Sequence, residues 1–287
     1  MRKNTLIKKG KLGLIIYLIV FIFFSIYALM LIYPLVWGFI SSFKGAKVYW
    51  NNMFGIIFEY KFENYARAIR EISDGDISFF GMFWNSIWFA VGSAFLTMEF
   101  TCAYSYVLAK YKFKGRNFLY GLCLFMISVP IGATLASTYR LMYSLKLANS
   151  YLILITATNV YGMNLILFHS YWKNISWSYA EAAQIDGANF YQIYFKAMRP
   201  QATPLMFTLG LMLFIGKWND YMSPLLYLPK KLTLATGLFR YNETAMRTGN
   251  MPVLFAGLFV CVAPILVVFA IFQDKMMGNI SIGGLKG

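Results

Sequence analysis

Charged side chains are scarce in this 287-residue sequence. They occupy 13% of its positions, about half of the share usual in soluble domains. Hydrophobic residues occupy 59% of the positions. Several apolar runs reach about twenty residues, the length at which a helix crosses the roughly 30 Å hydrocarbon core of a bilayer. The composition therefore excludes an ordinary soluble domain and predicts a multi-pass membrane protein.

Cysteine and histidine are also rare. The three cysteines, Cys102, Cys123 and Cys261, all fall inside apolar runs, so they do not form the framework of a small disulfide-rich domain. His169 is the only histidine, and no Cys/His spacing typical of a zinc site is present. We therefore predict no metal site in this chain.

A nucleotide-binding signature is missing as well. The spacing G-x-x-x-x-G-K-S/T of a phosphate-binding loop does not occur, and the terminal GLKG does not match it. We expect no catalytic residues and no cofactor of the chain's own. The net charge of +15 is spread over loops between apolar runs, which is typical of membrane proteins and argues against nucleic-acid binding.

The apolar runs predict an all-α membrane protein with about six transmembrane helices. Backbone polar groups in lipid must be satisfied within their own segment, and the alternation of barrel strands is absent. The predicted spans are Leu12–Ser41, Trp84–Ala109, Phe118–Tyr143, Ser150–Trp172, Ala202–Tyr227 and Pro252–Met277.

Lysine and arginine predict the orientation of these spans. The first eleven residues carry five basic side chains, and residues 110–116 read KYKFKGR. Basic loops stay in the cytoplasm, so we predict that both termini are cytoplasmic. The predicted parts are tails 1–11 and 278–287, a transmembrane domain 12–277, external loops 42–83 and 228–251, and a cytoplasmic loop 174–203. The segment FENYARAI in the first external loop predicts a short amphipathic helix.

The cytoplasmic loop contains an organised polar stretch, SYAEAAQIDGANFYQIYFKAMRP, from Ser178 to Pro200. Ser178 and Glu181 have the spacing of a capping box, which predicts a helix start. Small residues follow on one face, at Ala180, Ala183 and Gly187, and we expect that face to admit a partner closely. Gly187 predicts a break.

A second amphipathic helix is predicted after Gly187. Apolar residues recur at the i, i+3, i+4, i+7 spacing of one helix face, and we expect this face to hold the loop against the membrane domain. Its members are Phe190, Ile193, Tyr194 and Ala197.

The order E-A-A-x-x-D-G-A in this stretch resembles the EAA motif of bacterial ABC importer permeases. The resemblance implies that the loop is a coupling helix that docks into a groove on a cytoplasmic ATPase. Two positions depart from the family pattern, because Arg199 replaces a frequent Leu and Ala197 a larger aliphatic residue. The matching, ATPase-coupling positions are Glu181, Ala182, Ala183, Asp186, Gly187, Ala188 and Pro200.

The resemblance extends along most of the chain. Residues 103–120, 145–155 and 218–228, Val129–Pro130 and the Gly-rich ending resemble the smaller subunit of maltose-type carbohydrate permeases. This implies a type I ABC importer permease fold in the bacterial cytoplasmic membrane, and uptake of a carbohydrate, with an oligosaccharide favoured. The implied partners are a homologous permease, an ATPase dimer that binds ATP and Mg²⁺, and an extracellular sugar-binding protein.

Candidate residues for the sugar path are polar or aromatic, because aromatic faces stack on sugar rings while amides and carboxylates bond hydroxyls. Trp218 and Tyr221 could instead be interfacial anchors, and Asp220 could merely neutralise Lys217. Glu99 is the one acid deep in a span, where it could line the path or pair with a neighbouring helix or subunit. The candidates are Glu99, Asn159, Asn164, Trp218, Asn219, Asp220 and Tyr221.

Two other functions fit part of the pattern. One is an ABC permease for a non-sugar solute. This alternative stays open because Arg140 and Lys217 lie near the external ends of predicted spans. The other is an ion-coupled secondary transporter. Such a carrier normally needs more than one intramembrane carboxylate, so Glu99 alone supports it weakly.

Overall fold

Helices account for all the regular elements that the structure describes, as the sequence predicts. The structure is a computed structural model of the 287-residue chain, and it describes residues 11–56, 60–73, 77–128, 135–156, 158 and 160–283. The chain divides into two units, which are considered separately below. One comprises Met1–Ile69 and Asn242–Val260, and the other Arg70–Tyr241 and Cys261–Gly287.

The longest helices correspond to three of the predicted spans. Within the described residues, three helical stretches are long and apolar enough to cross a membrane. They lie in α1 (Lys11–Ser42), α4 (Phe79–Lys110) and α14 (Met251–Gly283), the first, second and sixth predictions. The predicted tail 278–287 therefore begins within α14, and its last four residues lie outside the described part.

The fifth predicted span is shorter than expected. Its helix, α11 (Arg199–Trp218), ends where Asn219 Nδ2 donates to the Ile215 carbonyl at 2.9 Å. Asp220 Oδ1 then accepts the Ser223 N–H at 2.9 Å, and α12 (Met222–Tyr227) begins. The prediction of one helix up to Tyr227 was wrong because side-chain capping by Asn and Asp competes with helix continuation.

The third and fourth predicted spans are each divided. The third contains α5 (Arg116–Ser128) and α6 (Leu135–Ser144). The fourth contains α7 (Ile153–Thr156) and α8 (Met163–Asn174). Gly162 precedes α8 with φ +135°, a conformation that glycine adopts readily and other residues rarely do. In the fourth span, apolar content alone thus predicted a continuous helix where the backbone turns at Gly162.

In the first unit, aromatic side chains join α1 to the start of α14. The Trp37 and Phe255 ring centroids lie 5.1 Å apart, and Phe39 and Phe259 lie 5.3 Å apart. Lys44 follows α1 and is fully buried. Its Nζ donates to the carbonyls of Asn52 and Met53 at 3.3 and 3.1 Å, beyond α2 (Ala46–Asn51). These bonds satisfy a charge that would otherwise be costly to bury.

The predicted amphipathic helix in the first loop is confirmed as α3 (Glu63–Ile72). The loop predicted as 228–251 contains α13 (Leu234–Thr248). Both helices cross the boundary between the two units.

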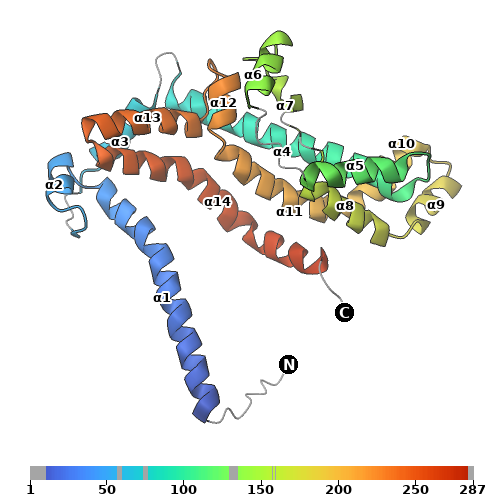
Figure 1. Ribbon diagram of the computed structural model, residues 1–287, viewed down its shortest axis with the longest axis horizontal. Coiled ribbons are helices and arrows are strands. Elements are labelled where there is room, and N and C mark those ends of the chain that lie inside the picture. Colours follow the sequence, from blue (N-terminus) through green and yellow to red (C-terminus); the bar gives the residue numbers. More distant parts are fainter. Residues whose placement is uncertain are drawn as a thin grey trace. The chain divides into compact units, whose positions relative to one another are not determined.

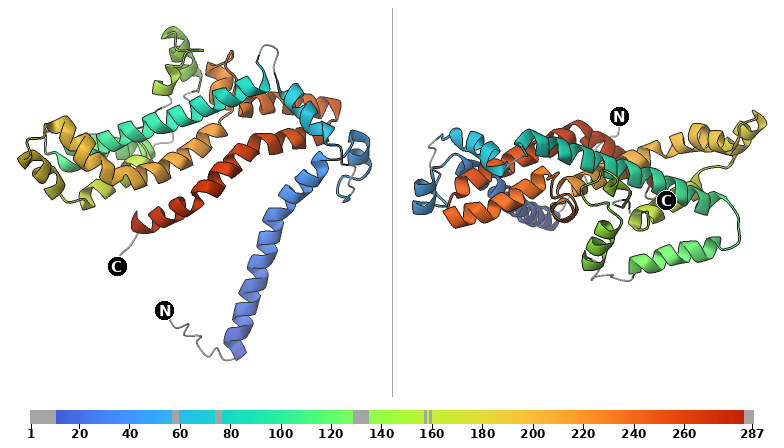
Figure 2. Two further views of the ribbon diagram at one scale, coloured as in Figure 1. Left: turned by 180° about the vertical axis from the view of Figure 1, so that it is seen from behind. Right: turned by 90° about the horizontal axis from the view of Figure 1, so that it is seen from above.

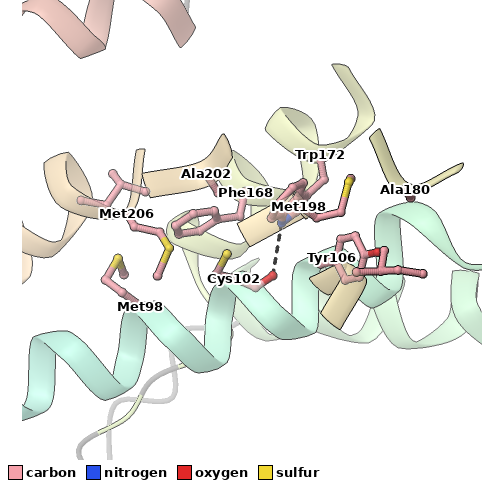
Figure 3. Close-up of a cluster of buried hydrophobic side chains, with 11 residues drawn as sticks. Met98, Cys102, Tyr106, Phe168, Trp172, Ala180, Met198, Ala202 and Met206 are labelled. Atoms are coloured by element: carbon pink, nitrogen blue, oxygen red, sulfur yellow. Dashed lines mark hydrogen bonds between the residues drawn. The ribbon is translucent and has the colours of Figure 1, made fainter. Parts of the chain in front are cut away.

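In the second unit, α4, α8 and α11 pack together around one cluster of buried side chains (Figures 1 and 2). The α4 members, Met98, Cys102 and Tyr106, are four residues apart and therefore lie on one helix face. Figure 3 shows them opposite side chains of α8 and α11. The cluster comprises Met98, Cys102, Tyr106, Phe168, Trp172, Ala180, Ile193, Met198, Ala202, Met206 and Leu209.

Candidate functional site

The EAA stretch folds into three short helical elements at one end of the second unit (Figure 1). They are α9 (Ser178–Ile185), α10 (Phe190–Gln192) and the π-helical turn η1 (Ile193–Met198), which continues into α11. We call residues 178–198 the coupling segment. The predicted helix–break–helix order is confirmed.

The predicted capping box of Ser178 and Glu181 was wrong. Trp177 is the N-cap of α9, without a side-chain cap bond. The Ser178 N–H donates to Ser176 Oγ at 3.2 Å, and the two serine hydroxyls lie 2.8 Å apart. Trp177 is half-buried and its ring lies 5.8 Å from that of Tyr111. The helix therefore begins one residue before the predicted start. We attribute this to the contact between Trp177 and Tyr111, which residue spacing does not reveal.

A capping box does occur at the second helix. Asn189 Oδ1 accepts the Gln192 N–H at 3.0 Å, and Gln192 Oε1 accepts the Asn189 N–H at 2.9 Å. The sequence signal was the Asn-x-x-Gln spacing, a variant of the capping pattern with Asn as the N-cap. Together, these bonds start α10 directly after the break.

The small-residue face of α9 points into the protein. Ala180 is 1% exposed and belongs to the buried cluster, while Ala183 and Ala188 pack against that cluster. The prediction that this face receives a partner was therefore wrong for Ala180 and Ala183, whereas Gly187, its third member, is exposed. Small side chains here let α9 approach Tyr106 and Trp172, because a methyl group leaves room for large neighbouring rings.

The opposite side of the coupling segment is exposed and partly apolar. Glu181, Ala182 and Asp186 are exposed on it. Five large side chains project from the same segment, and we call them the outer face. They are Tyr179 at 50% exposure, Ile185 at 86%, Phe190 at 73%, Tyr191 at 78% and Phe195 at 56%. Such a gathering of exposed apolar side chains is typical of an interaction site.

The second helix was predicted to hold the loop on the membrane domain. Ile193 is buried in the cluster and Tyr194 packs against it, and Ala197 is half-buried, so this prediction is correct for them. It was wrong for Phe190, which belongs to the outer face. The wider π-helical turn of η1 changes the rotation per residue, so simple 3.6-residue spacing does not place every side chain.

Gly187 makes the turn between α9 and α10 with φ +80°, and a Cβ there would meet nothing within 4 Å. We expect Gly187→Val to destabilise the coupling segment by about 1–2 kcal/mol through backbone strain alone. Gly187→Asn should cost less, because Asn tolerates the left-handed region. Hydrogen exchange of the α9 amides would measure the difference. Equal protection in both variants would contradict this explanation.

Glu99 pairs with Arg199 at the start of a neighbouring helix, which is one of the roles predicted for it. Arg199 Nε donates to Glu99 Oε2 at 2.9 Å, and Arg199 Nη2 also bonds Glu99 Oε1. The Glu99 side chain is 20% exposed and the Arg199 side chain 30%. Residue spacing does not join these two side chains, which are 100 positions apart in the sequence. The available signal was an isolated acid in a span and an unexpected base before Pro200.

Two of the predicted path residues lie in one pocket. Asn164 and Asp220 line a space of about 310 Å³ between α8 and α11. Lys217 lines it as well, with its Nζ 3.6 Å from Asp220 Oδ2. Asp220 therefore partly neutralises Lys217 and still borders the pocket.

The other path candidates have local partners. Trp218 is 4% exposed and its Nε1 donates to the Cys261 carbonyl at 3.2 Å. Such burial leaves no open ring face for a sugar in this conformation, and also excludes an interfacial anchor. Tyr221 stacks on Phe239 with ring centroids 4.4 Å apart, Asn219 caps α11, and Asn159 lies outside the described residues.

Comparison with known proteins agrees with this geometry. Residues 101–276 match the family described as "Binding-protein-dependent transport system inner membrane component". The arabinooligosaccharides transport system permease protein AraQ of Halalkalibacterium halodurans is 27% identical, over 92% of this chain and 94% of its own length. The multiple sugar-binding transport system permease protein MsmG of Streptococcus mutans is 31% identical, over 93% and 96%.

A solved structure has the same fold. It is a chain in the crystal structure of a bacterial ABC transporter involved in the import of the acidic polysaccharide alginate. The TM-score is 0.75 at 24% sequence identity, covering 92% of this chain and 98% of the other. The likeness confirms the predicted importer-permease fold.

Proposed function

The chain belongs to the family of binding-protein-dependent transport system inner membrane components, and from this premise we propose that it takes up an oligosaccharide as the transmembrane permease of an ATP-driven importer. The relatives above are named as permeases for arabinooligosaccharides and for multiple sugars. The family is one of transport permeases in the inner membrane, in agreement with the absence of a nucleotide-binding motif from the sequence.

One observation carries the proposed mode of action, namely the exposed outer face of the coupling segment. Ile185, Phe190 and Tyr191 are exposed for more than two thirds of their area, next to the exposed carboxylates Glu181 and Asp186. A projecting apolar surface bordered by carboxylates is complementary, in shape and charge, to an apolar groove bordered by basic side chains. Our proposed occupant of this surface is the cytoplasmic ATPase.

The matching EAA positions then divide into two roles. Glu181, Ala182 and Asp186 would contact the ATPase, because they are exposed. The inward residues Ala183 and Ala188 would position α9 on the buried cluster. Gly187 makes the turn. Pro200 lies in the first turn of α11, directly after η1.

The buried cluster connects α9 with α4, α8 and α11. Packed interiors transmit displacement because they have little free volume. In the proposed mechanism, ATP-driven closure of the ATPase dimer moves α9, and these helices follow, so that access alternates between the two sides of the membrane. ATP and Mg²⁺ would be held by the ATPase alone.

The proposed complex also contains a homologous permease and an extracellular sugar-binding protein, which would meet residues 228–251. An ion-coupled carrier is disfavoured because Glu99 is already paired with Arg199. A carboxylate that is already held in an ion pair does not offer the free site that a coupling ion requires.

Uptake of labelled oligosaccharide into proteoliposomes containing the assembled complex tests the function. We expect uptake only with ATP on the ATPase side and binding protein on the other. Uptake driven by an ion gradient without ATP would contradict the proposal. A thermal-shift screen of the binding protein would identify the sugar, and a preference for non-sugar solutes would overturn the carbohydrate assignment.

A further inference from the structure

The Glu99–Arg199 pair joins α4 to the residue at which η1 becomes α11. It lies at the border of a largely apolar groove of about 330 Å³, whose lining includes Val91, Phe95 and Phe207. Charges attract more strongly beside apolar groups than in water. Removing one partner there leaves the other charge without compensation.

The neighbouring contacts between α4 and this junction are apolar. Glu99 directly follows Met98, and Arg199 directly follows Met198, and both methionines belong to the buried cluster (Figure 3). Methionine is flexible and adapts to different neighbours, so this packing holds the helices together without fixing their register. The two parallel bonds between Arg199 and Glu99 are directional and can fix it.

The junction itself needs such support. η1 is a π-helical turn, which interrupts the regular bonding of a helix. Pro200 follows Arg199 and has no N–H to donate. On the α8 side, Tyr171 Oη donates to the Gln201 carbonyl at 2.6 Å, so a second polar bond stabilises the start of α11.

We propose that Glu99 and Arg199 are positioning residues for transport, because they hold the η1–α11 junction on α4 so that a displacement of α9 moves α4 and α11 together. This inference rests on the proposed coupling role of the segment. Neither residue belongs to the outer face, to which we assign the ATPase contact. Breaking it should therefore leave ATPase binding intact while ATP hydrolysis no longer drives uptake efficiently.

The test uses the complete importer in proteoliposomes, with sugar uptake and ATP hydrolysis measured on the same samples. In Glu99→Gln and in Arg199→Gln we expect uptake per ATP to fall about tenfold, which corresponds to about 1.4 kcal/mol. Co-purification with the ATPase should be unchanged. The exchange Glu99→Arg with Arg199→Glu should restore most of the lost uptake. Lys112→Gln removes an exposed basic residue elsewhere and should behave as wild type.

Unchanged uptake per ATP in both single variants would overturn the inference. Loss of ATPase co-purification in either variant would also overturn it, because the pair would then only support the docking surface. Failure of the exchange variant to regain uptake, with its thermal stability intact, would do the same. Failure of the proposed function is distinguishable from these outcomes, because the wild-type complex itself would then show no ATP-dependent uptake.

Discussion

Replacement of Ile185 by aspartate is expected to abolish stable association with the ATPase. Ile185 is the most exposed large apolar residue of the outer face, at 86%, so its replacement removes no internal packing. At the centre of an interface, a single residue can contribute about 2 kcal/mol or more. A buried carboxylate in an apolar groove adds a desolvation penalty. Co-purification from detergent, followed by ATPase activity in proteoliposomes, measures the loss.

Ile56→Asp is the matched control for this change. Ile56 is 72% exposed, and it lies in the first loop, which we predict to face the outside. The same substitution there should leave ATPase association intact. Equal loss in both variants would indicate a general effect of the charge, and retained association in Ile185→Asp would contradict the docking assignment.

Replacement of Trp172 by alanine is expected to have the largest effect on stability. Trp172 is fully buried in the cluster that connects α9 with the transmembrane helices. Its Nε1 donates to the Cys102 carbonyl at 3.2 Å, the bond drawn in Figure 3. Loss of the ring should cost about 3–5 kcal/mol, because surrounding side chains fill such a cavity only partly.

Thermal unfolding in detergent with a thiol-reactive dye suits this measurement, since Cys102, Cys123 and Cys261 are all buried and free. Trp172→Phe keeps most of the volume and should lose only about 1 kcal/mol with the hydrogen bond. Trp84 is 65% exposed on α4, and Trp84→Ala should change the midpoint little. Equal midpoints for Trp172→Ala and Trp84→Ala would contradict the role of the cluster.

Much of the fold is predictable because membrane helices depend on local composition. The apolar runs of α1, α4 and α14 satisfy their own backbone bonds and need no partner to be recognised. The breaks are less predictable. Asn219 and Asp220 end α11 early, and Gly162 interrupts the fourth predicted span. Each break depends on a few polar or glycine residues that hydropathy averages over.

The candidate site was likewise only partly predictable from the sequence. The capping and glycine signals predicted the helix–break–helix element that the structure shows at residues 178–198. Spacing did not reveal which side of α9 is buried, because the alanine face would suit an internal neighbour or an external partner equally well. Packing decided it, since Ala180 is buried in the same cluster as Tyr106 and Trp172.

By itself, the sequence determined the membrane character of the protein, its long apolar helices and the position of the coupling segment. These features depend on residues close together along the chain. The tertiary structure alone decided the inward face of α9, the burial of Trp218 and the pairing of Glu99 with Arg199. Each of these depends on side chains distant in sequence, whose free energy of burial or pairing is set by the neighbours that folding brings to them.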